Sequence, residues 1–256
     1  MITREIEIDK DSTSMLRARI HVPQNTSNAR FPLVVLLTGD GPKGTQSLSW
    51  TNIPPMLAKQ GIASFLFDFQ GLGYSPGQRR HLTLSRGLEN FRRAISTARK
   101  QPEIDESKIG IFGSSFGGNI AILYAAEDSD IKCIGLKSPV SFYPESFVAE
   151  FSRQLVEEWE TNGYIETIGF DYAFYTDSFR YNNYAAASTI KCPCLITHGD
   201  ADSVVPLRQS QFLRDALVSA KERRLNIYHG VGHGYSEPGA WQRMAEEFVE
   251  WFQTHL

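Results

Sequence analysis

The chain has 256 residues, of which 41% are hydrophobic and 21% charged, and its formal net charge is −3. This length suffices for one large domain with a substantial buried core. The slightly acidic balance provides no basic surface for nucleic acid, so nucleic acid is excluded as an expected partner. No apolar stretch approaches the roughly 20 residues that span a bilayer, so no membrane span is expected.

The first eight residues alternate apolar and polar like a strand and lack the apolar core of a signal peptide. The cysteines Cys133, Cys192 and Cys194 all fall in or beside apolar runs. An odd, low count favours reduced thiols and a cytoplasmic location. Cys192, Cys194 and His198 form an incomplete ligand set at an atypical spacing. We therefore expect neither a metal ion nor another cofactor.

Apolar runs alternate with helical patterns along the chain. The first two runs alternate as in an antiparallel hairpin, and the later ones are continuous, as in strands buried on both faces. This order predicts an α/β fold with a mostly parallel, eight-stranded sheet and helices on both faces. The strands are expected near 2–8, 15–22, 32–37, 62–67, 108–112, 132–136, 193–197 and 225–229, and the helices near 47–60, 83–100, 116–126, 207–219 and 239–254.

The most informative motif is Gly-Ser-Ser-Phe-Gly at residues 113–117, between an apolar run and a helix-like stretch. A sharp turn from strand to helix lifts a serine hydroxyl away from the backbone, and flanking glycines permit that turn. This context predicts Ser115 as a nucleophile. The alternative is a loop rich in glycine and serine that only begins a helix.

A serine nucleophile needs a base and an acid to activate it. His-Gly-Asp-Ala-Asp at 198–202 follows one apolar run, and His-Gly-Val-Gly-His at 229–233 follows another. Because parallel strands end at the same edge of a sheet, these segments are expected to lie near Ser115. A serine, a histidine and a carboxylate together form the site that transfers acyl groups.

Four motifs, taken in the order in which they occur along the chain, resemble those of the α/β-hydrolase superfamily. The resemblance extends over nearly the whole chain. The resemblance implies the α/β-hydrolase fold and a serine hydrolase. The motif set is similar to that of feruloyl or cinnamoyl esterases and monoacylglycerol lipases, with relatives among S9 and S33 peptidases. The motifs are Gly-Ser-Ser-Phe-Gly-Gly at 113–118, His-Gly-Asp-Ala-Asp-Ser-Val-Val-Pro at 198–206, Gly-Val-Gly-His-Gly at 230–234, and Asp-Phe-Gln-Gly-Leu-Gly-Tyr-Ser at 68–75, where Gln70 stands in place of the more usual arginine.

The resemblance also distributes the roles of acid and base. Asp202 occupies the position of the catalytic acid, and Asp200 is expected to tie its loop by accepting backbone N–H groups. His233, between two glycines, occupies the position of the base, while His229 is expected to be packed or solvated and His198 structural. The remaining histidines have no motif support and are expected to be ordinary surface or loop residues: His21, His81 and His255.

Two backbone amides are expected to form an oxyanion hole. In this fold one donor follows the nucleophile, which here is Phe116. The other comes from the loop after the third strand, Thr-Gly-Asp-Gly at 38–41, where relatives usually have histidine in place of Thr38. The resemblance assigns this role to the amide of Asp40. The alternative is a glycine-rich loop without a catalytic part.

Residues 138–190 interrupt the alternation and are interpreted as a cap or lid inserted after the sixth strand, with room for two or three helices, one of them over 146–161. The main domain is then divided into 1–137 and 191–256. The insert holds 13 of the chain's 30 aromatic residues. These rings are expected either to line an apolar or aromatic acyl pocket, or to pack the insert onto the main domain or a second subunit. Arg79 and Arg80 are expected in a solvated loop, with an anionic substrate as the alternative.

These observations together predict a serine hydrolase that acts on a small-molecule ester with an apolar or aromatic acyl group. An amidase or peptidase of the S9 or S33 kind uses the same triad, and so do thioesterases and acyltransferases. A receptor on the same fold, with no turnover, is a further alternative. A peptidase needs a polar anchor for a free amino terminus, and no such anchor is identifiable in the sequence.

Overall fold

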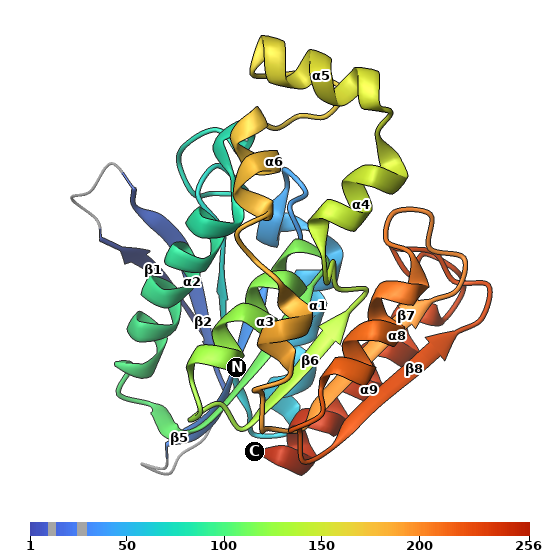
Figure 1. Ribbon diagram of the computed structural model, residues 1–256. Helices are drawn as coiled ribbons and strands as arrows, with labels where there is room; N and C mark the ends of the chain where they lie inside the picture. The colour runs from blue at the N-terminus through green and yellow to red at the C-terminus, as the bar shows by residue number, and fades with distance from the viewer. Residues whose placement is uncertain (10–13, 25–29) are drawn as a thin grey trace.

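The computed structural model describes residues 1–9, 14–24 and 30–256. Within these residues eight strands form one sheet in the order β1-β2-β4-β3-β5-β6-β7-β8 (Figure 1). The predicted α/β architecture is therefore confirmed. The strands are β1 (Ile2–Ile8), β2 (Leu16–Val22), β3 (Phe31–Leu37), β4 (Ala63–Phe67), β5 (Ile104–Ser114), β6 (Cys133–Lys137), β7 (Cys194–Gly199) and β8 (Arg223–Tyr228).

The sheet is mostly parallel. β1 pairs with β2 and β2 with β4 in antiparallel directions, and all later neighbours are parallel. β4 and β6 are buried at every residue, which agrees with their continuous apolar sequences. Because β3, β5, β6, β7 and β8 run the same way, the loops that follow them meet at one edge of the sheet.

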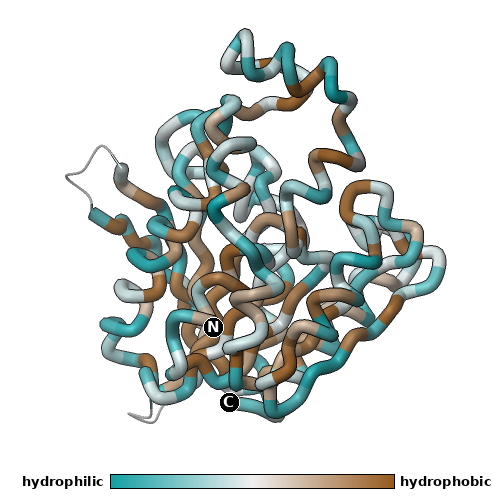
Figure 2. The backbone as a smooth tube through the Cα atoms, viewed as in Figure 1, coloured by the Kyte–Doolittle hydropathy of each residue, from teal (hydrophilic) through white to brown (hydrophobic). Residues whose placement is uncertain are grey.

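Two layers of helices cover the sheet (Figure 1). One face packs against α1 (Leu48–Lys59) and α9 (Ala240–His255). The other packs against α2 (Leu84–Arg99), α3 (Phe116–Glu127) and α8 (Leu207–Ala216). Figure 2 shows hydrophobic residues gathered along the central strands and hydrophilic ones along the outer surfaces. Two short 3-10 helices, η1 (Gly44–Gln46) and η2 (Arg79–His81), lie in loops at the edge where the parallel strands end.

The segment between β6 and β7 folds into four helices: α4 (Tyr143–Glu150), α5 (Arg153–Asn162), α6 (Tyr172–Ser178) and α7 (Asn183–Ala187). The single helix expected over 146–161 is divided into two. Phe151 is extended, and the Ser152 hydroxyl accepts the Leu155 N–H at 3.2 Å to cap a new helix. That helix ends at Gly163, whose φ of +71° is left-handed.

Aromatic rings fix this segment onto the core. Phe116, at the start of α3, lies 6.4 Å from the ring of Tyr143 and 6.3 Å from that of Phe174. The Trp159 indole N–H donates to the Phe170 carbonyl at 2.8 Å, so even its polar atom is satisfied inside the segment. Packing against the main domain is thus the observed role of the buried rings, which are Tyr143, Phe147, Trp159, Phe170 and Phe174.

The expectation for His21 was wrong. This residue lies in β2 and is only 9% exposed, with Nδ1 at 2.9 Å from the Thr3 hydroxyl on β1. Burial, together with the nearby charge of Arg19, lowers the pKa of His21 to about 4. The ring is therefore a neutral part of the sheet at physiological pH.

Candidate active site

Ser115 occupies a strained turn between β5 and α3. Its φ of 54° and ψ of −117° lie outside the regions that residues with a side chain normally adopt. The turn needs glycine on both sides, because a Cβ at Gly113 would lie 2.4 Å from the Gly117 carbonyl oxygen. A Cβ at Gly117 would lie 2.4 Å from the Thr38 carbonyl oxygen. Ser115 donates its own N–H to the Lys137 carbonyl at 3.0 Å, which ties the turn to the end of β6.

Asp202 lies after β7 with a fully buried side chain. Its Oδ1 accepts the N–H groups of Val204 at 2.9 Å and Val205 at 2.8 Å. Its Oδ2 lies 2.8 Å from His233 Nδ1 and 3.2 Å from His198 Nε2. Burial alone would raise the pKa of Asp202, but hydrogen bonding to the two histidines lowers it well below the usual range. The carboxylate is therefore ionised at neutral pH and holds His233 by Nδ1.

Asp200 lies only two residues away and has a different environment. Its Oδ1 accepts the Gly230 N–H at 2.7 Å, and its Oδ2 lies 2.8 Å from His229 Nδ1. The His229 side chain is 86% exposed. Asp200 thus ties two loops together at the surface, as the sequence led us to expect, and His229 is solvated.

Ser115 and His233 line the same cavity, which has a volume of about 540 Å³. Apolar side chains from α1, β5 and α9 form its walls, and the loop after β3 forms its rim. None of the described lining residues comes from 138–190, so this cavity does not contain the aromatic rings of the insert. Besides Ser115 and His233, the residues that line it include Asp40, Lys43, Trp50, Ile53, Phe112, Ser114, Lys137 and Met244.

The loop after β3 passes beside Ser115. A Cβ on Gly39 would lie 3.4 Å from Ser115 Cβ, so glycine allows a close approach here. The Asp40 carbonyl accepts Arg79 Nε at 2.8 Å, and its carboxylate accepts Arg79 Nη2 at 3.1 Å. Arg79 Nη1 also donates to the Gly169 carbonyl at 3.3 Å, and the guanidinium carbon lies 4.1 Å from the centre of the Phe170 ring. Arg79 therefore joins this loop to the insert, rather than lying free in solvent.

The segment Asp-Phe-Gln-Gly-Leu-Gly-Tyr-Ser at 68–75 packs against the continuation of the same loop. Asp68 Oδ1 accepts the Thr45 N–H at 2.7 Å, and Oδ2 accepts the Tyr74 N–H at 2.9 Å. The Asp68 side chain is buried and fills the space beside Gly44 and Gly73, where a Cβ would lie within 2.3 Å of its carboxyl group. The motif thus acts as a structural anchor for the chain that follows Asp40.

Lys137 is the residue of this site that the sequence analysis missed. It ends β6, is 9% exposed, and donates its Nζ–H to the His233 carbonyl at 2.7 Å. Its own carbonyl accepts the Ser115 N–H, so one residue contacts both the serine turn and the histidine loop. Burial lowers the pKa of Lys137 to about 8. The available signal was a lysine at the end of an otherwise apolar buried strand, Cys-Ile-Gly-Leu-Lys.

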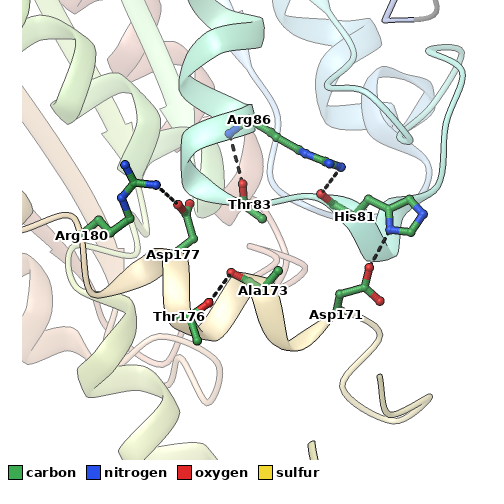
Figure 3. Close-up of a pocket in the computed structure, with 8 residues that line it drawn as sticks. All are labelled: His81, Thr83, Arg86, Asp171, Ala173, Thr176, Asp177 and Arg180. Atoms are coloured by element: carbon green, nitrogen blue, oxygen red, sulfur yellow. Dashed lines mark hydrogen bonds and ion pairs between the residues drawn. The ribbon is translucent and has the colours of Figure 1, made fainter. Parts of the chain in front are cut away.

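A second cavity, of about 410 Å³, lies between η2, the start of α2 and α6 (Figure 3). In it His81 Nδ1 lies 2.6 Å from Asp171, and Asp177 lies 3.5 Å from Arg180. Arg86 donates to the His81 carbonyl at 2.9 Å. The pair of His81 and Asp171 connects η2 to the segment between β6 and β7, whereas Asp177 and Arg180 both belong to that segment.

The cysteines take no part in the site. Cys133 and Cys194 are buried free thiols, Cys192 is partly buried, and burial raises the pKa of each. Among residues 1–9, 14–24 and 30–256, no three histidine, cysteine or acidic side chains are grouped to hold a metal ion. No helix in the same residues has the length and apolar character needed to cross a membrane.

Comparison with solved structures identifies the fold as that of the α/β-hydrolases. Est1E from Butyrivibrio proteoclasticus, solved with ferulic acid bound, aligns with a TM-score of 0.84 at 23% identity, over 98% of both chains. The acylaminoacyl peptidase of Pyrococcus horikoshii aligns with a TM-score of 0.79 at 20% identity, over all of this chain and 42% of that one.

Residues 48–256 match the prolyl oligopeptidase family, peptidase family S9, and the chain belongs to this family. A protein of Escherichia coli, described as an uncharacterized 31.7 kDa protein in the traX-finO intergenic region, is 24% identical over 269 aligned positions. That alignment covers 90% of this chain and 93% of the relative. A family of peptidases is a family of hydrolases, so the class of enzyme is hydrolase. An esterase domain, a dienelactone hydrolase and an acylaminoacyl peptidase all occur among the structural neighbours.

Proposed function

We propose that this protein hydrolyses carboxylic esters of small molecules through an acyl-enzyme intermediate on Ser115. The observation that carries the proposal is that Ser115 and His233 line one cavity while Asp202 holds the far nitrogen of His233 at 2.8 Å. The strained turn at Ser115 supports it further, because such strain persists where a side chain must be presented to a ligand.

In the proposed reaction Ser115 Oγ attacks the ester carbonyl carbon while His233 Nε2 accepts the hydroxyl proton. The tetrahedral intermediate collapses, the bond from carbon to the alcohol oxygen breaks, and His233 returns the proton to the departing alcohol. A water molecule then attacks the acyl-enzyme by the same route and releases the acid. Ionised Asp202 keeps the Nδ1 proton of His233 in place and stabilises the imidazolium.

The amides of Phe116 and Asp40 are the proposed donors to the oxyanion. Phe116 is the first residue of α3, and the first amides of a helix have no partner within the helix. Asp40 lies on the loop that passes beside Ser115, and Arg79 binds its carbonyl and its carboxylate. A donor of this kind accelerates the reaction about 10²- to 10³-fold.

The cavity walls support an apolar or aromatic acyl group. Trp50, Ile53, Phe112 and Met244 present apolar surface beside Ser115. Est1E, which shares the fold, binds ferulic acid, an aromatic carboxylic acid. The second candidate is a peptidase, which membership in family S9 and the likeness to an acylaminoacyl peptidase support.

A fluorophosphonate probe and two matched serine variants test the nucleophile. Wild-type protein should react with the probe and hydrolyse p-nitrophenyl butyrate with a burst of p-nitrophenol. Ser115→Ala should lose labelling and reduce kcat by at least about 10³-fold, because the acyl-enzyme cannot form. Ser114→Ala, one residue earlier, should retain labelling. Labelling that persists in Ser115→Ala would overturn the assignment.

A parallel series of aryl amides and aminoacyl p-nitroanilides separates the esterase from the peptidase. We expect kcat/KM for the esters to exceed that for the matched amides by more than about 10³-fold. A preference for aminoacyl amides would establish the peptidase instead. Labelling of Ser115 without turnover of any substrate would point to the ligand receptor.

A further inference from the structure

Lys137 faces the cavity beside Ser115 because of its position in β6. Side chains alternate between the two faces of a strand, so Cys133, Gly135 and Lys137 share one face. Cys133 packs into the core with α1 and α9, and a Cβ on Gly135 would lie 2.7 Å from Phe248 of α9. Lys137 therefore projects to the α1 and α9 side of the sheet, which is the side of the cavity, and it is one of the residues that line it.

The Lys137 ammonium group is incompletely compensated. Of its three N–H donors, one is directed to the His233 carbonyl, and Nζ lies 4.8 Å from the centre of the Tyr235 ring. Within residues 1–9, 14–24 and 30–256 no carboxylate oxygen lies within 4.0 Å of Nζ, and Asp202 attracts the group only from a greater distance. Burial of such a cation is unfavourable unless an anion compensates it.

The other charged side chains around the cavity do not neutralise the Lys137 ammonium group. Asp40 lines the cavity, but its carboxylate is paired with Arg79. Lys43 adds a second positive charge at the exposed rim. The cavity thus combines apolar walls with one buried ammonium group. These features fit a ligand whose acyl chain is apolar along its length and carries a negative charge at one end.

We propose that Lys137 binds a carboxylate carried on the acyl chain of the substrate, so that the preferred substrates are half-esters of dicarboxylic acids. The inference rests on the proposed function, because it places the ester carbonyl at Ser115. The acyl chain stays bound to Ser115 in both chemical steps, so a fixed positive charge in the cavity acts on it throughout. Lys137 determines specificity in this scheme and takes no part in proton transfer.

Matched esters test the proposal. The p-nitrophenyl half-esters of succinate, glutarate and adipate are compared with the p-nitrophenyl esters of butyrate, pentanoate and hexanoate, which have the same chain lengths without the charge. We expect wild-type kcat/KM to favour the charged member of at least one pair by more than about tenfold. Lys137→Met should reduce that ratio about 10- to 100-fold, which is the effect of one charged hydrogen bond.

Two further variants separate binding of the substrate charge from support of the His233 loop. Lys137→Gln keeps an N–H donor for the His233 carbonyl but has no charge, and it should lose the ratio as Lys137→Met does. Lys132→Met removes an exposed lysine immediately before β6 and should retain the wild-type ratio. Equal losses for charged and neutral esters in both Lys137 variants would overturn the proposal, and so would a wild-type preference for the neutral esters.

A binding measurement makes the proposal testable apart from catalysis. Calorimetric titration of Ser115→Ala protein with monomethyl glutarate and with methyl pentanoate, which lacks the carboxylate, should show tighter binding of monomethyl glutarate. Adding Lys137→Met should weaken the binding of monomethyl glutarate at least tenfold and leave that of methyl pentanoate within about threefold. Equal binding of both esters to Ser115→Ala would refute the role of Lys137, even in a protein that hydrolyses esters. Absence of ester turnover together with the predicted binding would refute the esterase instead.

Discussion

Asp202 contacts two histidine rings, and their surroundings assign them different parts. His198 is fully buried, with Nδ1 at 2.7 Å from the Ser210 hydroxyl and Nε2 at 2.9 Å from the Val205 carbonyl, so its ring is fixed at both ends. His233 is partly exposed and lines the cavity. Asp202 thus contacts one histidine that is fixed in the interior and a second one that lines the cavity with Ser115.

Asp202→Asn should reduce kcat for an activated ester about 10³- to 10⁴-fold, because an amide cannot hold the Nδ1 proton of His233 as a carboxylate does. Asp200→Asn, which changes the same group two residues away at the surface, should reduce kcat less than about fivefold. Steady-state kinetics of both variants at pH 7–8 provide the measurement. The opposite ranking would mean that Asp200 is the acid.

Between elements, Arg79 of η2 joins the loop after β3 to the insert. It binds both the carbonyl and the carboxylate of Asp40 while its third nitrogen contacts Gly169. Gly169 has a φ of +76°, and a Cβ there would lie 2.5 Å from Arg79 Nη1, so the contact requires glycine. The position of the insert and the position of the proposed oxyanion donor are therefore coupled through one side chain.

Arg79→Gln should lower kcat about 10- to 100-fold with little change in KM, because the Asp40 loop loses its fixed position while the cavity walls remain. Arg80→Gln is the matched control. Arg80 belongs to the same 3-10 helix and binds the insert through Asp171, but it is not bonded to Asp40. An equal decrease in both variants would show that attachment of the insert, rather than the loop, controls turnover.

The positions of strands and helices were predictable from the sequence where burial of apolar residues determines them. β3, β4, β6 and β7 are continuous apolar runs, and they appeared within one or two residues of the expected bounds. The break between α4 and α5 was not found, because a local cap at Ser152 ended an otherwise helical pattern. The serine turn and the histidine loops carried recognisable motifs.

Contacts between distant polar residues could not be predicted in the same way. Arg79 and Asp40 are 39 residues apart, and their pairing depends on how two loops meet above the sheet. For Lys137 the sequence showed the unusual residue but not its direction, which followed only once the register of β5 and β6 paired Lys137 with Ser114. Side-chain direction at a strand end changes with a shift of one residue.

At the scale of the whole molecule, Lys137 reduces stability at neutral pH. Its pKa is about 8 in the folded protein, against an ordinary value of 10.5. Below pH 8 both folded and unfolded chains carry the proton, and the folded state bears the unfavourable burial of the charge, an effect of the order of 3 kcal/mol. Between pH 8 and 10.5 the unfolded chain binds more protons than the folded one, so the free energy of unfolding rises with pH in this range.

Lys137→Met should therefore raise the free energy of unfolding at pH 7 by about 1–2 kcal/mol, since an apolar side chain replaces the buried charge while the His233 carbonyl loses its donor. The difference between variant and wild type should shrink as the pH rises from 8 to 10.5, because wild-type Lys137 then becomes neutral when folded. Urea unfolding at several pH values measures both effects, with Lys132→Met as the control for an exposed lysine. A variant that is less stable than wild type at pH 7 would show that the bond to His233 outweighs the burial of the charge. A variant that has a higher free energy of unfolding but has lost the preference for charged esters would show that Lys137 lowers folding stability and is needed for substrate recognition.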